Sequence, residues 1–176
     1  MQEQGEFMEN DGSALSESIE NYLKTIYELA PEGGSSSTND IAARLSVAPA
    51  SVTGMLKRLA TMDPPLVDYQ KHHGVQLTEE GRRVSLQIIR RHRLIELFLV
   101  KILGYSWDEV HEEAERLEHA VTERFGERLA RFLDNPHFDP HGDPIPNSDL
   151  QLPEQRTVGL NEVPNGQRVV VRRGFT

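Results

Sequence analysis

The chain has 176 residues, of which 37% are hydrophobic, enough to bury a core without covalent staples. It has no cysteine, which excludes disulfides and thiolate ligands, so any metal would be held by nitrogen and oxygen donors. The polar N-terminus lacks the apolar core of a signal peptide, and no apolar stretch approaches the roughly 18 residues of a membrane span. We therefore expect a cytoplasmic protein with no membrane association.

The distribution of charge matters more than its total. The formal net charge of −9 argues against nucleic-acid binding when the whole chain is taken together. Residues 37–93, however, carry nine Lys and Arg against five Asp and Glu, a local charge of +4. Much of the acid lies between Asp108 and Glu127. A basic region inside an acidic protein favours a nucleic-acid-binding part.

Three helices are predicted early in the chain. Apolar residues recur at helical spacing from Ser18 to Ala30, before a run of Pro, Gly and Ser ends the pattern. A second helix is expected to begin near Thr38, whose hydroxyl can cap it. A short turn follows, and Pro49 then suits the first turn of a third helix, where its missing N–H costs little.

After these helices the period of the pattern changes. Residues 66–69 and 75–77 read as two short strands of a hairpin. Thr78 is expected to cap a long helix that continues to about Leu103. The order helix, helix, turn, helix, hairpin is typical of a winged helix-turn-helix.

The C-terminal half is predicted to be helical and then irregular. A further helix should begin at Ser106 or Trp107 and run to about residue 133. Residues 135–153, rich in Pro, Gly, Asp and His, read as an extended linker. Residues 167–173 resemble one β-strand, which cannot bury a core by itself.

The third helix is the predicted DNA-recognition helix. Its first turn carries small residues, so backbone and hydroxyl groups can approach phosphates and base edges, and a helix N-terminus itself attracts phosphate. Few of these side chains can form two hydrogen bonds to one base. Much of the specificity should therefore come from methyl contacts, waters and DNA shape. The candidate DNA contacts are Thr38, Asn39, Ala48, Pro49, Ala50, Ser51, Thr53, Gly54, Lys57, Arg58 and Lys71.

A second pattern predicts a metal site. His111, Glu115, Glu118 and His119 are spaced i, i+4, i+7, i+8, which places them on one stripe of a helix. The preceding helix adds His92 and Glu96, again four residues apart. If the two helices are antiparallel neighbours, the stripes can face each other. Imidazole and carboxylate donors suit Mn²⁺, Fe²⁺ or Zn²⁺.

Other interpretations stay open at this point. A Glu-rich helix can be no more than a solvated face, and His137 and His141 can be ligands or part of a polar linker. A winged-helix regulator that responds to a small organic ligand is the alternative function. An enzyme is not expected, because no nucleophile or acid–base pair stands out beyond the candidate ligands.

Taken together, the two patterns resemble the diphtheria-toxin-repressor family of metal-dependent transcriptional repressors, which includes the manganese transport regulators. The similarity covers roughly Ser18 to Leu152. The segments that carry it are Glu20–Tyr27, Ala48–Thr53, Leu77–Gly81, Arg91–Leu94, Trp107–His111, Glu118–His119 and Gly142–Pro146.

The resemblance implies two neighbouring metal sites. The primary site would use Glu115, Glu118 and His119 with a donor from the first helix, and the second would use His92, Glu96 and His111. Asn21 stands where family members commonly present Met or Asp, and Lys24 where manganese types use an acid. The first-helix donor therefore stays open between Asn21 and Glu20. Glu115, where iron types have Cys, implies Mn²⁺, with Fe²⁺ as the alternative.

The resemblance also implies the organisation of the protein. The protein would be mainly α-helical, would bind pseudo-palindromic operator DNA as a homodimer, and would repress metal homeostasis genes. The expected divisions are a flexible tail at 1–17, a winged helix-turn-helix domain at 18–82, a metal-binding and dimerisation domain at 83–152, and a linker with the start of a truncated SH3-like domain at 153–176.

Overall fold

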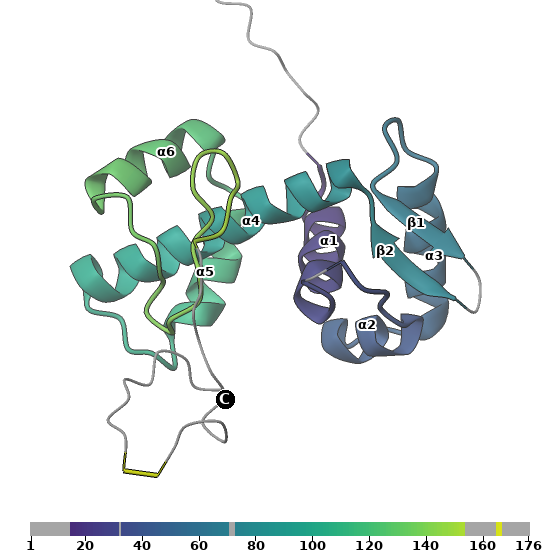
Figure 1. Cartoon of the computed structure of the whole chain (residues 1–176), viewed down its shortest axis with the longest axis horizontal. Helices are drawn as coiled ribbons and strands as arrows, with labels where there is room; N and C mark the ends of the chain where they lie inside the picture. The colour runs from purple at the N-terminus through teal and green to yellow at the C-terminus, as the bar shows by residue number, and fades with distance from the viewer. Residues whose placement is uncertain (1–14, 32, 71–72, 154–164, 167–176) are drawn as a thin grey trace, which may run out of the picture.

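The computed structural model of the chain describes residues 15–31, 33–70, 73–153 and 165–166, and it is mainly helical. Two lobes are joined by one long helix, α4 (Figure 1). Most of the expected tail, the strand expected at 167–173 and the SH3-like remnant lie outside the described residues. Within the described ranges, no helix is both long and apolar enough to cross a membrane.

The N-terminal lobe has the predicted element order. It contains α1 (Glu17–Leu29), α2 (Thr38–Leu45), α3 (Pro49–Ala60) and an antiparallel hairpin of β1 (Val67–Gln70) and β2 (Gly74–Leu77). The apolar faces of these elements form a shared core, which includes Leu23, Ile26, Ile41, Val52, Leu56, Leu59 and Val75. The helix-turn-helix and the hairpin are therefore one packed unit.

The start of α2 differs from the prediction. Ser37, not Thr38, is the cap: its hydroxyl accepts a hydrogen bond from the Asp40 N–H at 3.1 Å. Thr38 is the first residue of the helix. Either hydroxyl could cap a helix, and the sequence does not distinguish two adjacent capping residues. At the other end, Ser46 adopts a left-handed conformation that turns the chain toward α3.

Helix α4 (Glu79–Phe98) belongs to both lobes. Thr78 caps it as expected, accepting from the Gly81 N–H at 3.0 Å. Its N-terminal half packs into the first core through Val84 and Ile88, and its C-terminal half into the second through Leu94 and Ile95. The predicted continuation to Leu103 is present as the π-helical segment η1 (Leu99–Leu103), which ends at Gly104.

The prediction of a single helix to residue 133 is wrong. The chain forms α5 (Val110–Glu118) and then α6 (Glu123–Phe132). Thr122 starts the second helix, because its hydroxyl accepts from the Phe125 N–H at 3.2 Å. The apolar spacing continues through the break, which is why periodicity alone does not reveal it.

The expected linker at 135–153 is also more ordered than predicted. Phe138 and Pro144 form an isolated β-bridge, and Ile145 is buried in the second core. Asp139 is buried as well, and its carboxylate accepts hydrogen bonds at 2.8 Å from the N–H groups of His141 and Asp143. The segment therefore packs against α4 and places polar side chains beside that helix.

Candidate metal centre

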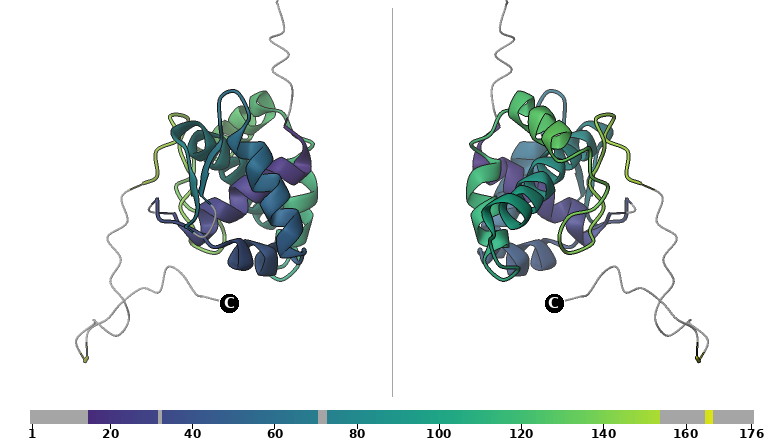
Figure 2. Two further views of the ribbon diagram at one scale, coloured as in Figure 1. Left: turned by 90° about the vertical axis from the view of Figure 1, so that its right-hand side faces the viewer. Right: turned by 90° about the vertical axis from the view of Figure 1, so that its left-hand side faces the viewer.

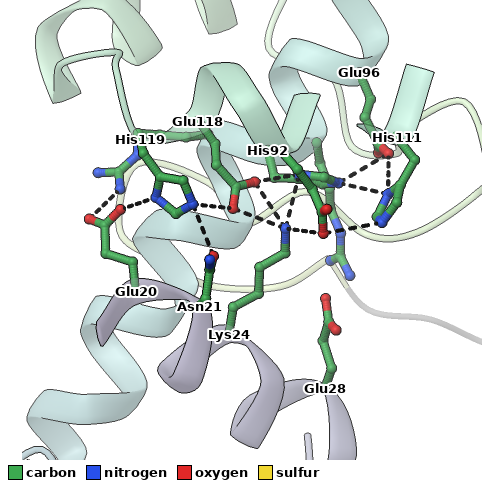
Figure 3. A network of polar contacts seen from close by, with 12 residues as sticks. Glu20, Asn21, Lys24, Glu28, His92, Glu96, His111, Glu118 and His119 are labelled. Carbon is green, nitrogen blue, oxygen red and sulfur yellow. Dashed lines mark hydrogen bonds and ion pairs between the residues drawn. The ribbon is translucent and has the colours of Figure 1, made fainter. Parts of the chain in front are cut away.

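Side chains from three helices meet where α1, of the N-terminal lobe, lies beside α4 and α5 (Figure 3). They form a continuous network of polar contacts, which we call the α1–α4–α5 cluster. Helix α1 supplies Glu20, Asn21 and Lys24, α4 supplies His92 and Glu96, and α5 with its C-cap supplies His111, Glu115, Glu118 and His119. Lys24 follows Glu20 and Asn21 by one turn, and Glu96 follows His92 by one turn. On α5, Glu115 follows His111 by one turn, and Glu118 and His119 follow Glu115 by one turn.

Glu118 is the buried centre of this cluster, with no exposed side-chain surface. Its two carboxylate oxygens accept hydrogen bonds from Lys24 Nζ at 3.1 and 2.9 Å. The carboxylate also contacts Nδ1 of His92 and lies 3.4 Å from Nε2 of His119. A buried carboxylate is tolerated only when it is paired and hydrogen-bonded, as it is here.

The second part of the cluster lies between α4 and α5. Oε1 of Glu96 is 3.0 Å from Nε2 of His92 and 3.1 Å from Nδ1 of His111. The two imidazoles are 3.2 Å apart, and Glu115 reaches Nε2 of His111 at 3.4 Å. His92 and Glu96 are buried, whereas His111 and Glu115 are about half exposed. One side of this group is therefore open to solvent.

The third part joins α1 to the end of α5. His119 places Nδ1 at 2.5 Å from a carboxylate oxygen of Glu20 and Nε2 at 2.9 Å from the amide oxygen of Asn21. Glu20 also accepts a hydrogen bond at 2.9 Å from Arg91 of α4. Both candidates for the first-helix donor thus reach His119, and Glu20 brings the negative charge.

A further group is not evident from the sequence. Asp139 and His141 approach Glu96, with His141 Nδ1 at 3.7 Å from Glu96 Oε2. The sequence leaves His141 open as a ligand, but the buried Asp139 gives no signal, because the segment reads as a polar linker. His137, the other histidine of this segment, is exposed, and its backbone oxygen accepts a hydrogen bond from the Ile145 N–H at 2.8 Å.

The contacts shift the acid–base equilibria of the buried groups. Burial opposes a charge on His92, but hydrogen bonds with Glu118 and Glu96 outweigh it and raise the pKa of His92 to about 9. Burial alone would raise the pKa of Glu96 and Glu118, yet the neighbouring histidines hold both below the usual range. At Asp139, burial prevails and raises the pKa. A metal ion at this cluster would compete with the protons on its imidazoles.

The donors present fit a hard or borderline divalent cation. In the described ranges, two groups of three side chains place one donor atom each within 4.8 Å of one another: His92 with Glu96 and His111, and Glu96 with Asp139 and His141. Both groups combine imidazole nitrogen with carboxylate oxygen, as Mn²⁺, Fe²⁺ and Zn²⁺ sites do. Glu96 is common to both and is the residue through which they are joined.

The expected DNA contacts lie at the opposite end of the N-terminal lobe, where α2, α3 and the hairpin form one face (Figure 2). Ala48, Pro49, Ala50, Ser51 and Gly54 are exposed along the start of α3, and so are Asn39, Lys57 and Arg58. Thr38 and Thr53 are half-buried, and the Thr53 hydroxyl donates to the Pro49 carbonyl at 3.1 Å. Lys71 lies outside the described residues.

A helix-turn-helix with a hairpin, joined by one helix to a lobe with a histidine–carboxylate cluster, defines a class: DNA-binding proteins that respond to a metal. Two family models match the chain in that order. They are the N-terminal DNA-binding domain of the iron-dependent repressors over residues 14–75 and their metal-binding and dimerisation domain over residues 78–147. The chain belongs to the iron-dependent repressor family.

Individual relatives agree with this assignment. The chain is 35% identical over 164 residues to the iron-dependent repressor IdeR of Mycobacterium leprae (strain TN), covering 89% of the chain and 70% of IdeR. It is 33% identical over 165 residues to the diphtheria toxin repressor of Corynebacterium diphtheriae, covering 89% and 72%. Among solved structures, a manganese-dependent transcriptional repressor in complex with manganese matches with a TM-score of 0.77, 43% identity, and coverage of 88% and 71%.

These matches make the protein a metal-dependent, DNA-binding transcriptional repressor. They decide against the regulator of a small organic ligand that the sequence alone leaves open. The residues that hold metal or contact DNA, and the domain division between residues 82 and 83, stay predictions. The α4 helix crosses that division without a break.

Proposed function

We propose that the protein is a cytoplasmic homodimer that binds pseudo-palindromic operator DNA when a divalent cation, Mn²⁺ or alternatively Fe²⁺, is bound at the α1–α4–α5 cluster. One observation carries this proposal. Glu20, Asn21 and Lys24 belong to a helix of the DNA-binding lobe, yet their side chains form hydrogen-bond contacts with Glu118 and His119 of the other lobe. A change at the cluster therefore acts directly on the position of α1.

The donor set favours Mn²⁺. The chain has no cysteine, and each candidate ligand offers an imidazole nitrogen or an oxygen. Carboxylate and other oxygen ligands suit Mn²⁺, whereas thiolates suit softer metals. The ligands we propose are His92, Glu96, His111, Glu115, Glu118 and His119, with Glu20 or Asn21 as the donor from α1. Asp139 and His141 extend the set at Glu96.

Coupling to DNA follows from how α1 is held. The apolar face of α1 packs into the same core as α2 and α3, while its polar face contacts α5. When bound, the cation would supply positive charge that offsets the repulsion among the clustered carboxylates. The residues of α1 and α5 would then be held together more firmly, which fixes the DNA-binding lobe relative to the dimerisation lobe. Such coupling exists only if the cation binds this arrangement more tightly than the alternatives.

On DNA, the exposed start of α3 would enter the major groove, with Lys57 and Arg58 beside the phosphates. In a two-fold dimer, two copies of α3 would reach half-sites separated by one helical turn, roughly 34 Å. Selection of duplexes from a random library with Mn²⁺ present is expected to enrich an inverted repeat. Enrichment of the same repeat in chelator, or of no repeat with either metal, would contradict the proposal.

The proposed DNA face gives a separate prediction. Lys57→Gln is expected to weaken binding similarly for different sequences and to reduce the slope of log affinity against log salt by about 2, because one phosphate contact is lost in each subunit of the dimer. Fluorescence anisotropy over a range of salt concentrations measures both effects. Lys101→Gln, which removes the same charge from an exposed position in η1, is the matched control and should leave the slope unchanged. An unchanged slope for Lys57→Gln would remove Lys57 from the interface.

A further inference from the structure

Lys24 places a fixed positive charge at the centre of the α1–α4–α5 cluster. Its side chain is only 7% exposed, and its ammonium lies within 3.1 Å of both oxygens of Glu118 and of Nδ1 of His92. Glu115 contributes a fourth contact at 3.8 Å. Figure 3 shows the ammonium between the Glu118 carboxylate and His92. The ammonium therefore has around it the oxygen and imidazole donors that a metal ion would require.

The distribution of compact donor groups supports the same conclusion. In the part of the chain that the structure describes, both groups of three donors within 4.8 Å include Glu96, and neither includes Glu118. Glu118 is nevertheless the most deeply buried carboxylate of the cluster and contacts two histidines. One difference between the two carboxylates is Lys24, whose ammonium hydrogen-bonds to both oxygens of Glu118.

We propose that Lys24 is a tethered cation that competes with divalent metal for Glu118. This inference rests on the proposed function, since it assumes that metal binds at the cluster. In the metal-free protein, the ammonium neutralises Glu118, and this ion pair is one contact between α1 and α5. Full engagement of Glu118 by metal requires the ammonium to leave, and Lys24 thereby sets the metal concentration at which the protein responds.

The test is a pair of measurements on Lys24→Met, which keeps an unbranched side chain one atom shorter than lysine and removes its charge. Mn²⁺ affinity, measured by calorimetry on chelator-stripped protein, is expected to rise about tenfold, because no fraction of the protein is held in the lysine-bound state. The melting temperature in chelator is expected to fall, because Glu118 is left buried without its cation. Addition of Mn²⁺ should restore it.

Two further variants keep the result interpretable. Lys24→Gln retains a hydrogen-bond donor and serves where Lys24→Met folds poorly, and it should also bind Mn²⁺ more tightly than the wild type. Lys101→Met removes an equal charge at an exposed site and should leave the Mn²⁺ affinity unchanged, which excludes an effect of net charge.

The outcomes separate the two proposals. If wild type binds Mn²⁺ and neither Lys24 variant binds it more tightly, the tethered-cation proposal is wrong while the proposed function stands. If Lys101→Met raises the affinity as much as Lys24→Met, competition at Glu118 is again excluded. If neither wild type nor the Lys24 variants bind Mn²⁺ or Fe²⁺, both proposals fail.

Discussion

Replacing Glu96 with glutamine is expected to weaken Mn²⁺ binding by more than about 100-fold, since even side chains that only orient a metal ligand contribute about 10- to 100-fold. Glu96 is shared by both compact donor groups and contacts His92, His111 and His141. Glutamine keeps the shape of the side chain but removes the charge and one acceptor oxygen. Metal binding should therefore be lost at both groups together, measured by calorimetry or by the electron paramagnetic resonance of free Mn²⁺.

The matched control is Glu112→Gln on α5. Its side chain is 78% exposed and pairs with Arg116 at 3.6 Å, away from the cluster. This variant should bind Mn²⁺ like the wild type, which excludes an effect of net charge on cation binding. The circular dichroism of Glu96→Gln in chelator should show an unchanged helix content. Wild-type Mn²⁺ affinity in folded Glu96→Gln would exclude Glu96, and with it both compact donor groups, from the metal site.

Replacing Gly81 with alanine is expected to destabilise the protein by about 3 kcal/mol or more, because a well-packed site cannot absorb an added methyl group. A Cβ at this position would lie 1.8 Å from the backbone oxygen of Leu66. That oxygen also accepts a hydrogen bond at 3.1 Å from the N–H of Thr78, which caps α4. The start of α4 and the loop before β1 are thus in close contact and hydrogen-bonded, so neither can shift independently to accommodate the added methyl group.

Thermal unfolding measures this effect, and a loss of roughly 10 °C corresponds to the expected free energy for a chain of this size. The control is Gly54→Ala in α3, where an added Cβ would meet no atom within 4 Å. Alanine there should stabilise the helix by about 1 kcal/mol, because glycine is a poor helix former. If Gly81→Ala melts like the wild type, the close packing of α4 on the loop is wrong.

The part of the site that lies within single helices could be predicted from the sequence. The spacing of His111, Glu115 and Glu118 places them on one face, and His92 with Glu96 form the matching pair on α4. Their convergence followed from a short connection between neighbouring helices. The same local reasoning predicted the order of helices and strands in the N-terminal lobe, where capping residues and a change of period mark each boundary.

What the sequence did not reveal depends on contacts between distant segments. The resemblance marks Lys24 only as a departure, at a position where manganese types use an acid. The packing of α1 against α5 is what places its ammonium beside Glu118. Asp139 lies in a segment whose composition is that of a linker, although its carboxylate is buried near Glu96. The break between α5 and α6 at Thr122 was missed because capping overrode a continuing apolar pattern.

The role of metal in DNA binding is tested most directly by the affinity of the purified protein for its selected duplex. Fluorescence anisotropy measures this affinity first in chelator and then during titration with Mn²⁺. We expect affinity to increase at least about tenfold with metal, within the usual range of coupling between two sites. When the duplex is kept subsaturating, the Mn²⁺ concentration at half of this increase should match the Mn²⁺ dissociation constant measured without DNA. Equal affinity for the duplex in chelator and in saturating Mn²⁺ or Fe²⁺ would contradict the role of metal in DNA binding.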